Sequence, residues 1–361
     1  MSQFHPLKIA AVRRETPDAV SIAFEVPDEL REAYRFVPGQ YLTLRTRFGE
    51  EEARRSYSIC SGLDDPQLRV AVKKVEGGLF SCFANEQLQP GMTVDVMTPE
   101  GRFTAAPESG AARSYVAFAS GSGVTPILSI VKSLLTREPA SRFTLFYGNR
   151  TTDSIIFREE LEDLKDRFLD RFTLVHVLSR ENQDIDLLFG RLDPQRIERL
   201  AAARLFDPAA TDAFFVCGPG DMIESARQAL SALGVPADKV RSELFVPADG
   251  EVVPRRPASA RAREAAEAGV AVEAIIDGSH RRFTMTDSDE NVIDAAHRHG
   301  VELPYSCKGG MCCTCRCKVV EGEAEMAVNY SLQPWEIEQG FILSCQARPL
   351  TRSLVLDYDA V

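Results

Sequence analysis

The sequence predicts a multidomain protein with an antiparallel β-barrel, an α/β domain built on a parallel sheet and a small α+β domain. Three observations support this prediction. The chain has 361 residues, enough for two or three hydrophobic cores. The hydrophobic pattern changes near Arg113 from short strands to strands that alternate with helices. Of the nine cysteines, six fall between Cys307 and Cys345, which sets the end of the chain apart.

Residues 1–108 are predicted to form the β-barrel. Short apolar stretches separated by turn residues are typical of an antiparallel sheet that closes on itself. The expected strands are Leu7 to Arg13, Ala19 to Val26, Tyr41 to Arg47, Leu68 to Val75 and Thr93 to Met97.

Residues 109–247 are predicted to form the α/β domain, because apolar strands alternate there with helical stretches. The expected strands are Tyr115 to Ala119, Phe143 to Tyr147, Phe172 to Leu178 and Ala213 to Cys217. Residues 248–270 contain two prolines and few large apolar side chains, so they are predicted to be a linker, partly helical at most. Residues 271–361 form the third domain.

Charge and composition exclude several classes of partner. The formal net charge is -11 and the pI is about 5.2, so the chain lacks the concentrated basic face that nucleic acids require. The first residues show no signal-peptide pattern, and no stretch reaches the roughly 18 apolar residues of a spanning helix. We therefore expect a cytoplasmic protein with neither a nucleic-acid nor a membrane partner.

The cysteine cluster has the spacing of an iron-sulfur site. Cys307, Cys312 and Cys315 follow the pattern C-x4-C-x2-C, and Cys345 comes after 29 further residues. This is the plant-type spacing for a [2Fe-2S] cluster, in which each iron takes two thiolates. The glycines that follow Cys307 allow the backbone to fold closely over a cluster and to direct N–H groups at sulfur. These four cysteines are the predicted metal ligands.

A structural zinc site is the alternative, since Cys312-x2-Cys315 alone would suit tetrahedral thiolate zinc. Such sites usually use two separated CxxC pairs, and this chain has one beside the four-cysteine pattern. Cys313 and Cys317 are surplus to four ligands. By alternation Cys317 is expected to face the core of a strand from Arg316 to Val320, and Cys313 is expected to be a bystander.

Two segments of the barrel carry groups that a flavin needs. Arg55-Ser56-Tyr57-Ser58 is expected to begin a strand. Tyr57 can stack on an isoalloxazine ring, Arg55 can pair with a phosphate and Ser58 can hydrogen-bond near the reactive nitrogen. Gly78 to Ser81 precede a short predicted helix whose N-terminus can bind a pyrophosphate. In isolation, an exposed strand and an ordinary helix cap explain these segments equally well.

Two loops of the α/β domain are candidates for dinucleotide binding. The loop Ser120 to Pro126 contains Gly121, Gly123 and Thr125 and lies between an apolar strand and a predicted helix. Cys217-Gly218-Pro219 again ends a strand and starts a helix. Both loops are therefore expected at the carboxyl edge of one parallel sheet, where ligands bind. Cys217 can alternatively be a packed residue at the end of its strand.

The order of these motifs, RSYS, GLFS, GSGVTP, CGP and the cysteine loop, resembles the ferredoxin-NADP reductase superfamily in the version with a fused C-terminal ferredoxin. The resemblance covers nearly the whole chain outside the linker. It implies a β-grasp-like ferredoxin domain, a nicotinamide cofactor and FAD. It also implies that electrons pass from the nicotinamide through the flavin and the cluster to a partner protein.

The same resemblance implies roles for individual residues. FAD would be bound by Arg55, Tyr57 and Ser58, with pyrophosphate contacts at Gly78 and Ser81. The nicotinamide would lie near Thr125 and Cys217. In the segment Ser242 to Phe245, Glu243 and Phe245 would border the flavin. Ser58, Cys217 and Glu243 are the candidate catalytic residues.

The strings YSCKGGMCCTCRCKVVEGEAEM, NYSL, GFILSCQARP and LDYDA are similar to the reductase subunits of bacterial phenylacetyl-CoA epoxidases. This narrower resemblance implies a di-iron oxygenase component as acceptor. Residues 271–361 hold 14 Asp and Glu against 8 Lys and Arg, a local net charge of -6, which favours an acceptor with a basic docking patch. The alternatives are a reductase for a Rieske-type oxygenase or steroid hydroxylase, and a non-catalytic cluster protein with a vestigial flavin domain.

Three residues suggest that the nicotinamide cofactor is NADPH rather than NADH. Ser179 and Arg180 follow the predicted strand Phe172 to Leu178, and Arg150 ends a neighbouring strand. Similar serine-arginine pairs in the family bind a 2'-phosphate, and Arg150 could add a second cation. Otherwise both arginines are solvated surface charges.

Overall fold

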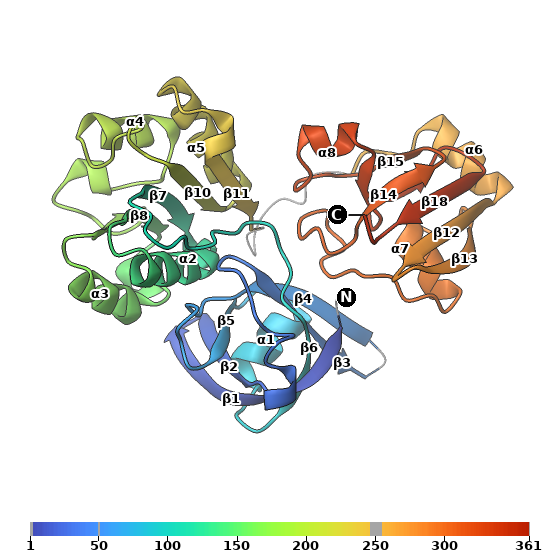
Figure 1. Cartoon of the computed structure of the whole chain (residues 1–361), viewed down its shortest axis with the longest axis horizontal. Helices are drawn as coiled ribbons and strands as arrows, with labels where there is room; N and C mark the ends of the chain where they lie inside the picture. Colours follow the sequence, from blue (N-terminus) through green and yellow to red (C-terminus); the bar gives the residue numbers. More distant parts are fainter. Residues whose placement is uncertain (1–2, 50, 246–254, 361) are drawn as a thin grey trace. The chain divides into compact units, whose positions relative to one another are not determined.

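The computed structural model of the chain describes residues 3–49, 51–245 and 255–360 (Figure 1). These residues fall into two compact units, one containing residues 4–49 and 51–245 and the other residue 3 and residues 255–360. The first unit holds both the barrel and the α/β part, so the domain boundary predicted at residues 108 and 109 stays a prediction. Among the described residues, no helix is long and apolar enough to cross a membrane, and the cellular location also stays a prediction.

The barrel is a six-stranded antiparallel sheet in the order β4-β3-β6-β1-β2-β5. Its strands are β1 (Phe4–Thr16), β2 (Ala19–Glu25), β3 (Tyr41–Phe48), β4 (Glu51–Ser58), β5 (Leu68–Lys73) and β6 (Thr93–Met97). A bridge between Ile59 and Val70 joins the chain after β4 to β5 and closes the barrel. The five strands predicted here are confirmed, because alternating side chains such as Ile22 and Phe24 fill the core.

The predicted start of the strand that contains Arg55 to Ser58 is wrong. Arg55 to Ser58 end this strand rather than begin it, since β4 starts at Glu51. The start of β4 is mostly charged, so hydrophobic alternation gave no sign of it. The strand forms because it pairs with β3 along its whole length, from Phe48 opposite Glu51 to Tyr41 opposite Ser58. The RSYS motif therefore lies where the chain leaves the barrel sheet, in contact with helix α1 (Leu79–Glu86).

The α/β part contains a five-stranded parallel sheet in the order β11-β10-β7-β8-β9. Its strands are β7 (Ser114–Ser120), β8 (Arg142–Asn149), β9 (Phe172–Leu178), β10 (Ala213–Gly218) and β11 (Val240–Leu244). Helices α2 (Val124–Arg137), α3 (Arg158–Arg167), α4 (Pro194–Ala202) and α5 (Gly220–Ala232) cover it. Along β7, Ala117 packs in the core with α2 and α3, whereas Phe118 packs in the core with α4 and α5. The predicted parallel sheet with helices on both faces is confirmed.

The second unit has a mixed five-stranded sheet in the order β13-β12-β18-β14-β16 and a two-stranded ribbon β15-β17. The strands are β12 (Val270–Ile276), β13 (Ser279–Met285), β14 (Arg316–Glu321), β15 (Ala324–Met326), β16 (Phe341–Leu343), β17 (Ala347–Pro349) and β18 (Ser353–Asp357). Helix α7 (Val292–Arg298) contacts β13, and α8 (Pro334–Glu338) contacts β16. Ile293 and Leu354 lie in the shared core, which confirms the predicted α+β fold.

Residues 255–268 differ from the predicted linker, because they are fixed to the second unit. Helix α6 (Ala260–Ala268) begins after Ser259, whose side chain caps it, and Ala265 is buried in the core of the unit. Ser259 N donates to Glu325 Oε1 at 2.9 Å, and Arg256 N donates to Ala327 O at 3.1 Å. These partners are distant in the chain, so no local pattern revealed the anchoring. Residues 248–254 of the predicted linker lie outside the described residues.

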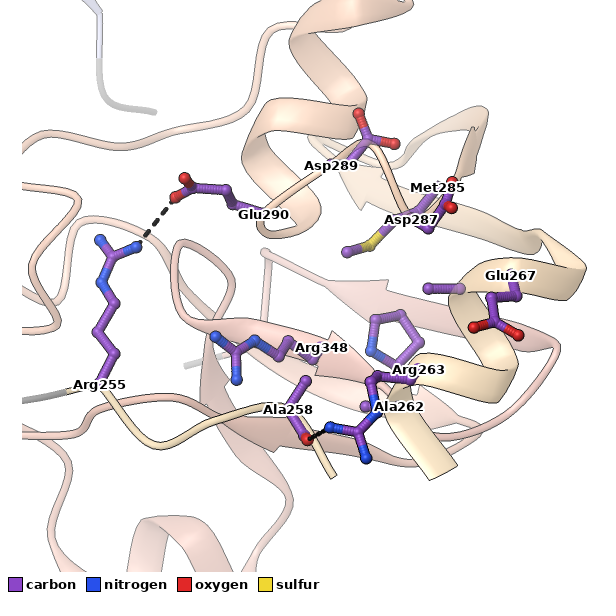
Figure 2. Close-up of a pocket in the computed structure, with 12 residues that line it drawn as sticks. Arg255, Ala258, Ala262, Arg263, Glu267, Met285, Asp287, Asp289, Glu290 and Arg348 are labelled. Carbon is purple, nitrogen blue, oxygen red and sulfur yellow. Dashed lines mark hydrogen bonds and ion pairs between the residues drawn. The ribbon is translucent and has the colours of Figure 1, made fainter. Parts of the chain in front are cut away.

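A groove of about 550 Å³ lies between this anchored segment and the turn before α7 (Figure 2). Arg255 pairs with Glu290 at 3.0 Å, and Arg263 donates to Ala258 O at 3.0 Å. The charged residues of the lining carry both signs: Arg255, Arg263, Arg348, Glu267, Asp287, Asp289 and Glu290. The groove therefore favours neither an anion nor a cation, and it belongs to the packing of α6.

Candidate active site and cluster-binding loop

Two loops meet where the strand order of the parallel sheet reverses. After β7 the chain adds β8 and β9 on one side, whereas β10 and β11 lie on the other side. Open α/β sheets bind ligands at the carboxyl ends of their strands, at such a reversal. Gly121 and Gly123 follow β7, and Cys217 and Gly218 end β10, so both predicted loops lie at this position.

The two loops approach so closely that residue 123 has no room for a side chain. A Cβ atom on Gly123 would lie 2.1 Å from Cys217 O and 2.9 Å from Gly218 N. Gly121 has a φ of 54°, and no atom lies within 4 Å of where its Cβ would be. Thr125 is buried, and its Oγ1 donates to Ser122 O at 3.0 Å. The result is a bare backbone surface at the start of α2, which suits a dinucleotide.

Residues from three separate segments converge beside these loops. Ser58 Oγ, at the end of β4, donates to Glu243 Oε2 at 3.4 Å. Glu243 on β11 is the register partner of Cys217 on β10. Phe245 follows β11, and its N–H donates to Gly218 O at 2.9 Å. The three residues predicted to be catalytic thus lie together where the barrel meets the sheet.

Burial controls the protonation of Glu243 and Cys217. It raises the pKa of Glu243 to about 8, while the hydrogen bond from Ser58 acts in the opposite direction. Burial also raises the pKa of the Cys217 thiol well above its usual value, and the negative charge of Glu243 adds to this effect. At neutral pH both side chains are therefore mainly in their protonated, neutral forms.

The predicted flavin residues lie on β4 and α1, which contact each other. The ring of Tyr57 is 5.5 Å from that of Phe80 on α1. Arg55 is exposed, and its Nη1 donates to Arg54 O at 2.8 Å. Ser81 Oγ accepts from Val75 N at 3.0 Å and so fixes the turn before the helix. Gly78 at the N-cap has no side chain to bond the first N–H groups of α1, which suits a phosphate.

The residues predicted to bind a 2'-phosphate lie side by side at the ends of β8 and β9. Ser179 N donates to Asn149 O at 2.9 Å, and Arg180 N donates to Arg150 O at 2.8 Å. Both arginine side chains are exposed. Two guanidinium groups therefore extend from adjacent strands at the ligand-binding edge of the sheet.

The four predicted ligands form two pairs of thiols. A hydrogen bond between Cys307 and Cys312 lowers the pKa of Cys307 and raises that of Cys312. A second one between Cys315 and Cys345 lowers the pKa of Cys345 and raises that of Cys315. In the described part of the chain, no three side chains of His, Cys, Asp or Glu are placed to share one metal ion. Two pairs of thiols suit a [2Fe-2S] cluster, in which each iron takes two thiolates.

The loop from Cys307 to Cys315 is shaped to surround a cluster. Gly309 N donates to Cys307 Sγ at 3.3 Å. Lys308 and Cys313 adopt the left-handed conformation, with φ of 47° and 58°, which non-glycine residues seldom do. Such backbone strain is typical of loops that bind a ligand.

Sequence reasoning missed two side chains that donate to ligand sulfur atoms. Thr314 Oγ1 donates to Cys312 Sγ at 3.3 Å, and Gln346 Nε2 donates to Cys345 Sγ at 3.6 Å. Gln346 also donates to Lys308 O at 2.7 Å, so it ties the two ligand segments together. Both residues are polar and lie near ligands in the sequence, which is the signal that could have revealed them.

Models of three protein families match the chain in the order of its parts. They describe an oxidoreductase FAD-binding domain (residues 6–105), an oxidoreductase NAD-binding domain (residues 118–228) and a 2Fe-2S iron-sulfur cluster binding domain (residues 274–350). The chain is also 45% identical to a subunit of the 1,2-phenylacetyl-CoA epoxidase of Escherichia coli, over 100% of the chain and 99% of that protein. The chain belongs to the ferredoxin-NADP reductase superfamily. Its C-terminal part is a fused [2Fe-2S] ferredoxin domain.

The reductase is similar to other oxygenase reductases over its full length. It is 35% identical to the ferredoxin reductase component of 3-ketosteroid-9-alpha-monooxygenase from Rhodococcus rhodochrous, with 98% of the chain and 96% of that protein covered. Its fold matches phthalate dioxygenase reductase with a TM-score of 0.61 and 22% identity, over 98% of each chain. The protein is therefore an electron-transfer oxidoreductase that uses FAD, a nicotinamide dinucleotide and a [2Fe-2S] cluster.

Proposed function

We propose that this reductase passes electrons from NADPH to a di-iron oxygenase that acts on phenylacetyl-CoA. One observation carries the proposal: the full-length identity to the epoxidase protein is 45%, against 35% to the ketosteroid monooxygenase component. Reductases of this architecture share their cofactor motifs, so a difference of this size over the whole chain supports a shared acceptor. The net charge of -6 in residues 271–361 supports an acceptor protein with a basic docking surface.

The proposal assigns a cofactor to each group of residues. Arg55, Tyr57, Ser58, Gly78 and Ser81 hold FAD. Gly121, Gly123, Thr125, Cys217 and Gly218 bind the nicotinamide dinucleotide, with Phe245 at the border of the flavin. Cys307, Cys312, Cys315 and Cys345 hold the cluster. Bound flavin supplies the conversion between the two-electron chemistry of the nicotinamide and the one-electron chemistry of the cluster.

The residues of the junction prepare the site for that chemistry. Because the pKa of Glu243 is about 8, its carboxyl group is neutral at pH 7 and places no negative charge beside an electron-accepting ring. The hydrogen bond from Ser58 orients this carboxyl group. The protonated Cys217 thiol is fully buried on the strand next to Glu243.

Preference for NADPH is part of the proposal and is supported by the two exposed guanidinium groups of Arg150 and Arg180. A 2'-phosphate carries a charge that a ribose hydroxyl lacks, and arginine binds phosphate with charge-assisted hydrogen bonds. Ser179 directly follows β9, and its hydroxyl donates to Asn149 O at 3.3 Å, which fixes it beside the end of β8.

Reconstitution tests the proposed acceptor. The full-length reductase would be combined with the catalytic subunits of the E. coli epoxidase, NADPH, oxygen and phenylacetyl-CoA. We expect formation of the ring epoxide with matching consumption of NADPH, and no product when Cys312→Ser replaces the wild-type reductase. Absence of epoxide, together with turnover of a Rieske-type ketosteroid oxygenase, would contradict the proposed acceptor and favour the steroid hydroxylase alternative.

A further inference from the structure

The C-terminal residues are fixed to the sheet of the second unit. Tyr358 N donates to Ile275 O at 3.0 Å. The carboxylate of Asp359 accepts from Asp277 N and Gly278 N, both at 2.8 Å. On the other side, Arg316 Nη1 donates to Ala360 O at 3.5 Å. The position of Tyr358 is therefore set by contacts before and after it.

This anchoring places Tyr358 next to the interior side of the cluster ligands. In the pairing of β14 with β18, Lys318 lies opposite Asp357, so the next step of the antiparallel register sets Tyr358 at the level of Cys317. Tyr358 packs against the core that contains Cys315, Cys317 and Cys345. Two of these three cysteines are predicted cluster ligands.

The hydroxyl of Tyr358 is buried, and within the described residues it has no hydrogen-bond partner. Ser344 and Cys317 lie close enough to influence its pKa, but neither meets hydrogen-bond geometry. Ser344 Oγ in turn donates to the carbonyl of Cys315 at 3.0 Å. Buried polar groups are nearly always satisfied, so an unsatisfied hydroxyl at this position requires a reason.

We propose that Tyr358 raises the reduction potential of the [2Fe-2S] cluster. Its buried hydroxyl stabilises the reduced state, together with the neighbouring polar groups of Ser344 and Cys317. The electron that enters the cluster increases the negative charge on its thiolate ligands. A hydroxyl dipole close to that charge, in a buried site, favours the reduced state. One electron enters and no proton moves. Burial raises the pKa of Tyr358 well above its usual value, so the phenol stays protonated.

The test is the midpoint potential of the cluster in full-length Tyr358→Phe, followed by absorbance and by the EPR signal of the reduced cluster. Loss of one hydrogen-bond-sized interaction should lower the equilibrium constant for reduction about five-fold, or about 40 mV for one electron. The potential should therefore become more negative. Tyr330→Phe is the matched control, because Tyr330 is an exposed tyrosine of the same unit, and its potential should equal that of the wild type.

A second readout detects the proton of the Tyr358 hydroxyl directly. In the reduced wild-type protein, electron-nuclear double resonance should detect several protons that are coupled to the cluster and are replaced on transfer to deuterated water, among them those of Gly309 N–H and the Thr314 hydroxyl. One of these signals should be missing in Tyr358→Phe with full cluster content, while the others remain. Absence of the proton in the wild type, or an unchanged potential in a variant with full cluster content, would overturn the proposal. An equal shift in Tyr330→Phe would overturn it as well.

Discussion

The cluster loop and the flavin-nicotinamide junction acquire their chemistry in opposite ways. Three of the four cluster thiols come from the short segment Cys307 to Cys315, which also provides its own backbone donor. The junction joins Ser58 to Glu243, 185 residues apart, and depends on the burial of a carboxyl group. The loop is encoded by local spacing, and the junction by the packing of a barrel against a sheet. A change in the loop should therefore remove the [2Fe-2S] cluster, whereas a change in the junction should alter the reduction of the flavin by NADPH.

The largest effect is expected from Cys312→Ser, which breaks the first thiol pair. Transfer to the acceptor protein should be lost, because one iron no longer has two thiolates. Reduction of ferricyanide by NADPH should stay within about two-fold of wild type, since distant sites act independently. Absorbance and iron content check the cluster. Cys313→Ser is the matched control, and loss of the cluster in that variant would show that the ligand assignment is wrong.

Gly123→Ala should have the next largest effect, and it acts on the flavin-nicotinamide junction. The added Cβ would lie 2.1 Å from the backbone oxygen of Cys217, which cannot move without shifting β10. We expect ferricyanide reduction to fall about 100-fold, because small displacements of reacting groups have effects of that size. The cluster content should not change. Ser122→Ala in the same loop should behave like wild type, and similar rates for both variants would contradict the close approach.

Arg180→Ala should weaken the preference for NADPH over NADH. Loss of a charge-assisted hydrogen bond to a 2'-phosphate should raise the KM for NADPH roughly 10-fold and leave that for NADH unchanged. The matched control is Arg142→Ala, an exposed arginine at the opposite end of β8. An equal change in both KM values would refute the 2'-phosphate role.

Glu243→Gln should have the smallest effect and appear only in the pH profile. A carboxyl group with a pKa of about 8 is neutral below that pH and becomes negative as the pH rises through it. In the wild type, the rate of flavin reduction by NADPH should therefore fall as the pH rises above about 8, because negative charge enters the junction. Glutamine stays neutral, so this step should vanish in stopped-flow measurements. The exposed control Glu198→Gln should retain it, and a step that survives in Glu243→Gln would assign it to another group.

The same contrast explains what the sequence could reveal. The spacing of Cys307, Cys312, Cys315 and Cys345 predicted ligands that the structure brings together in two pairs, because a loop that short constrains its own geometry. The residue types of the junction were also predicted, yet the raised pKa of Glu243 comes from its burial in the folded chain, which no local pattern encodes. The start of β4 and the anchoring of residues 255–268 were missed for a related reason. Charged or alanine-rich segments become ordered only through partners that are distant in the chain.

An anaerobic titration of the wild type and of Cys312→Ser with NADPH tests most directly whether the two regions act independently. In the wild type, the flavin and cluster absorbance bands should both bleach, and the EPR signal of a reduced [2Fe-2S] cluster should develop. In the variant, the flavin band alone should bleach, at the wild-type rate. A flavin that NADPH no longer reduces once the cluster is lost would show that the cluster loop and the junction do not act independently.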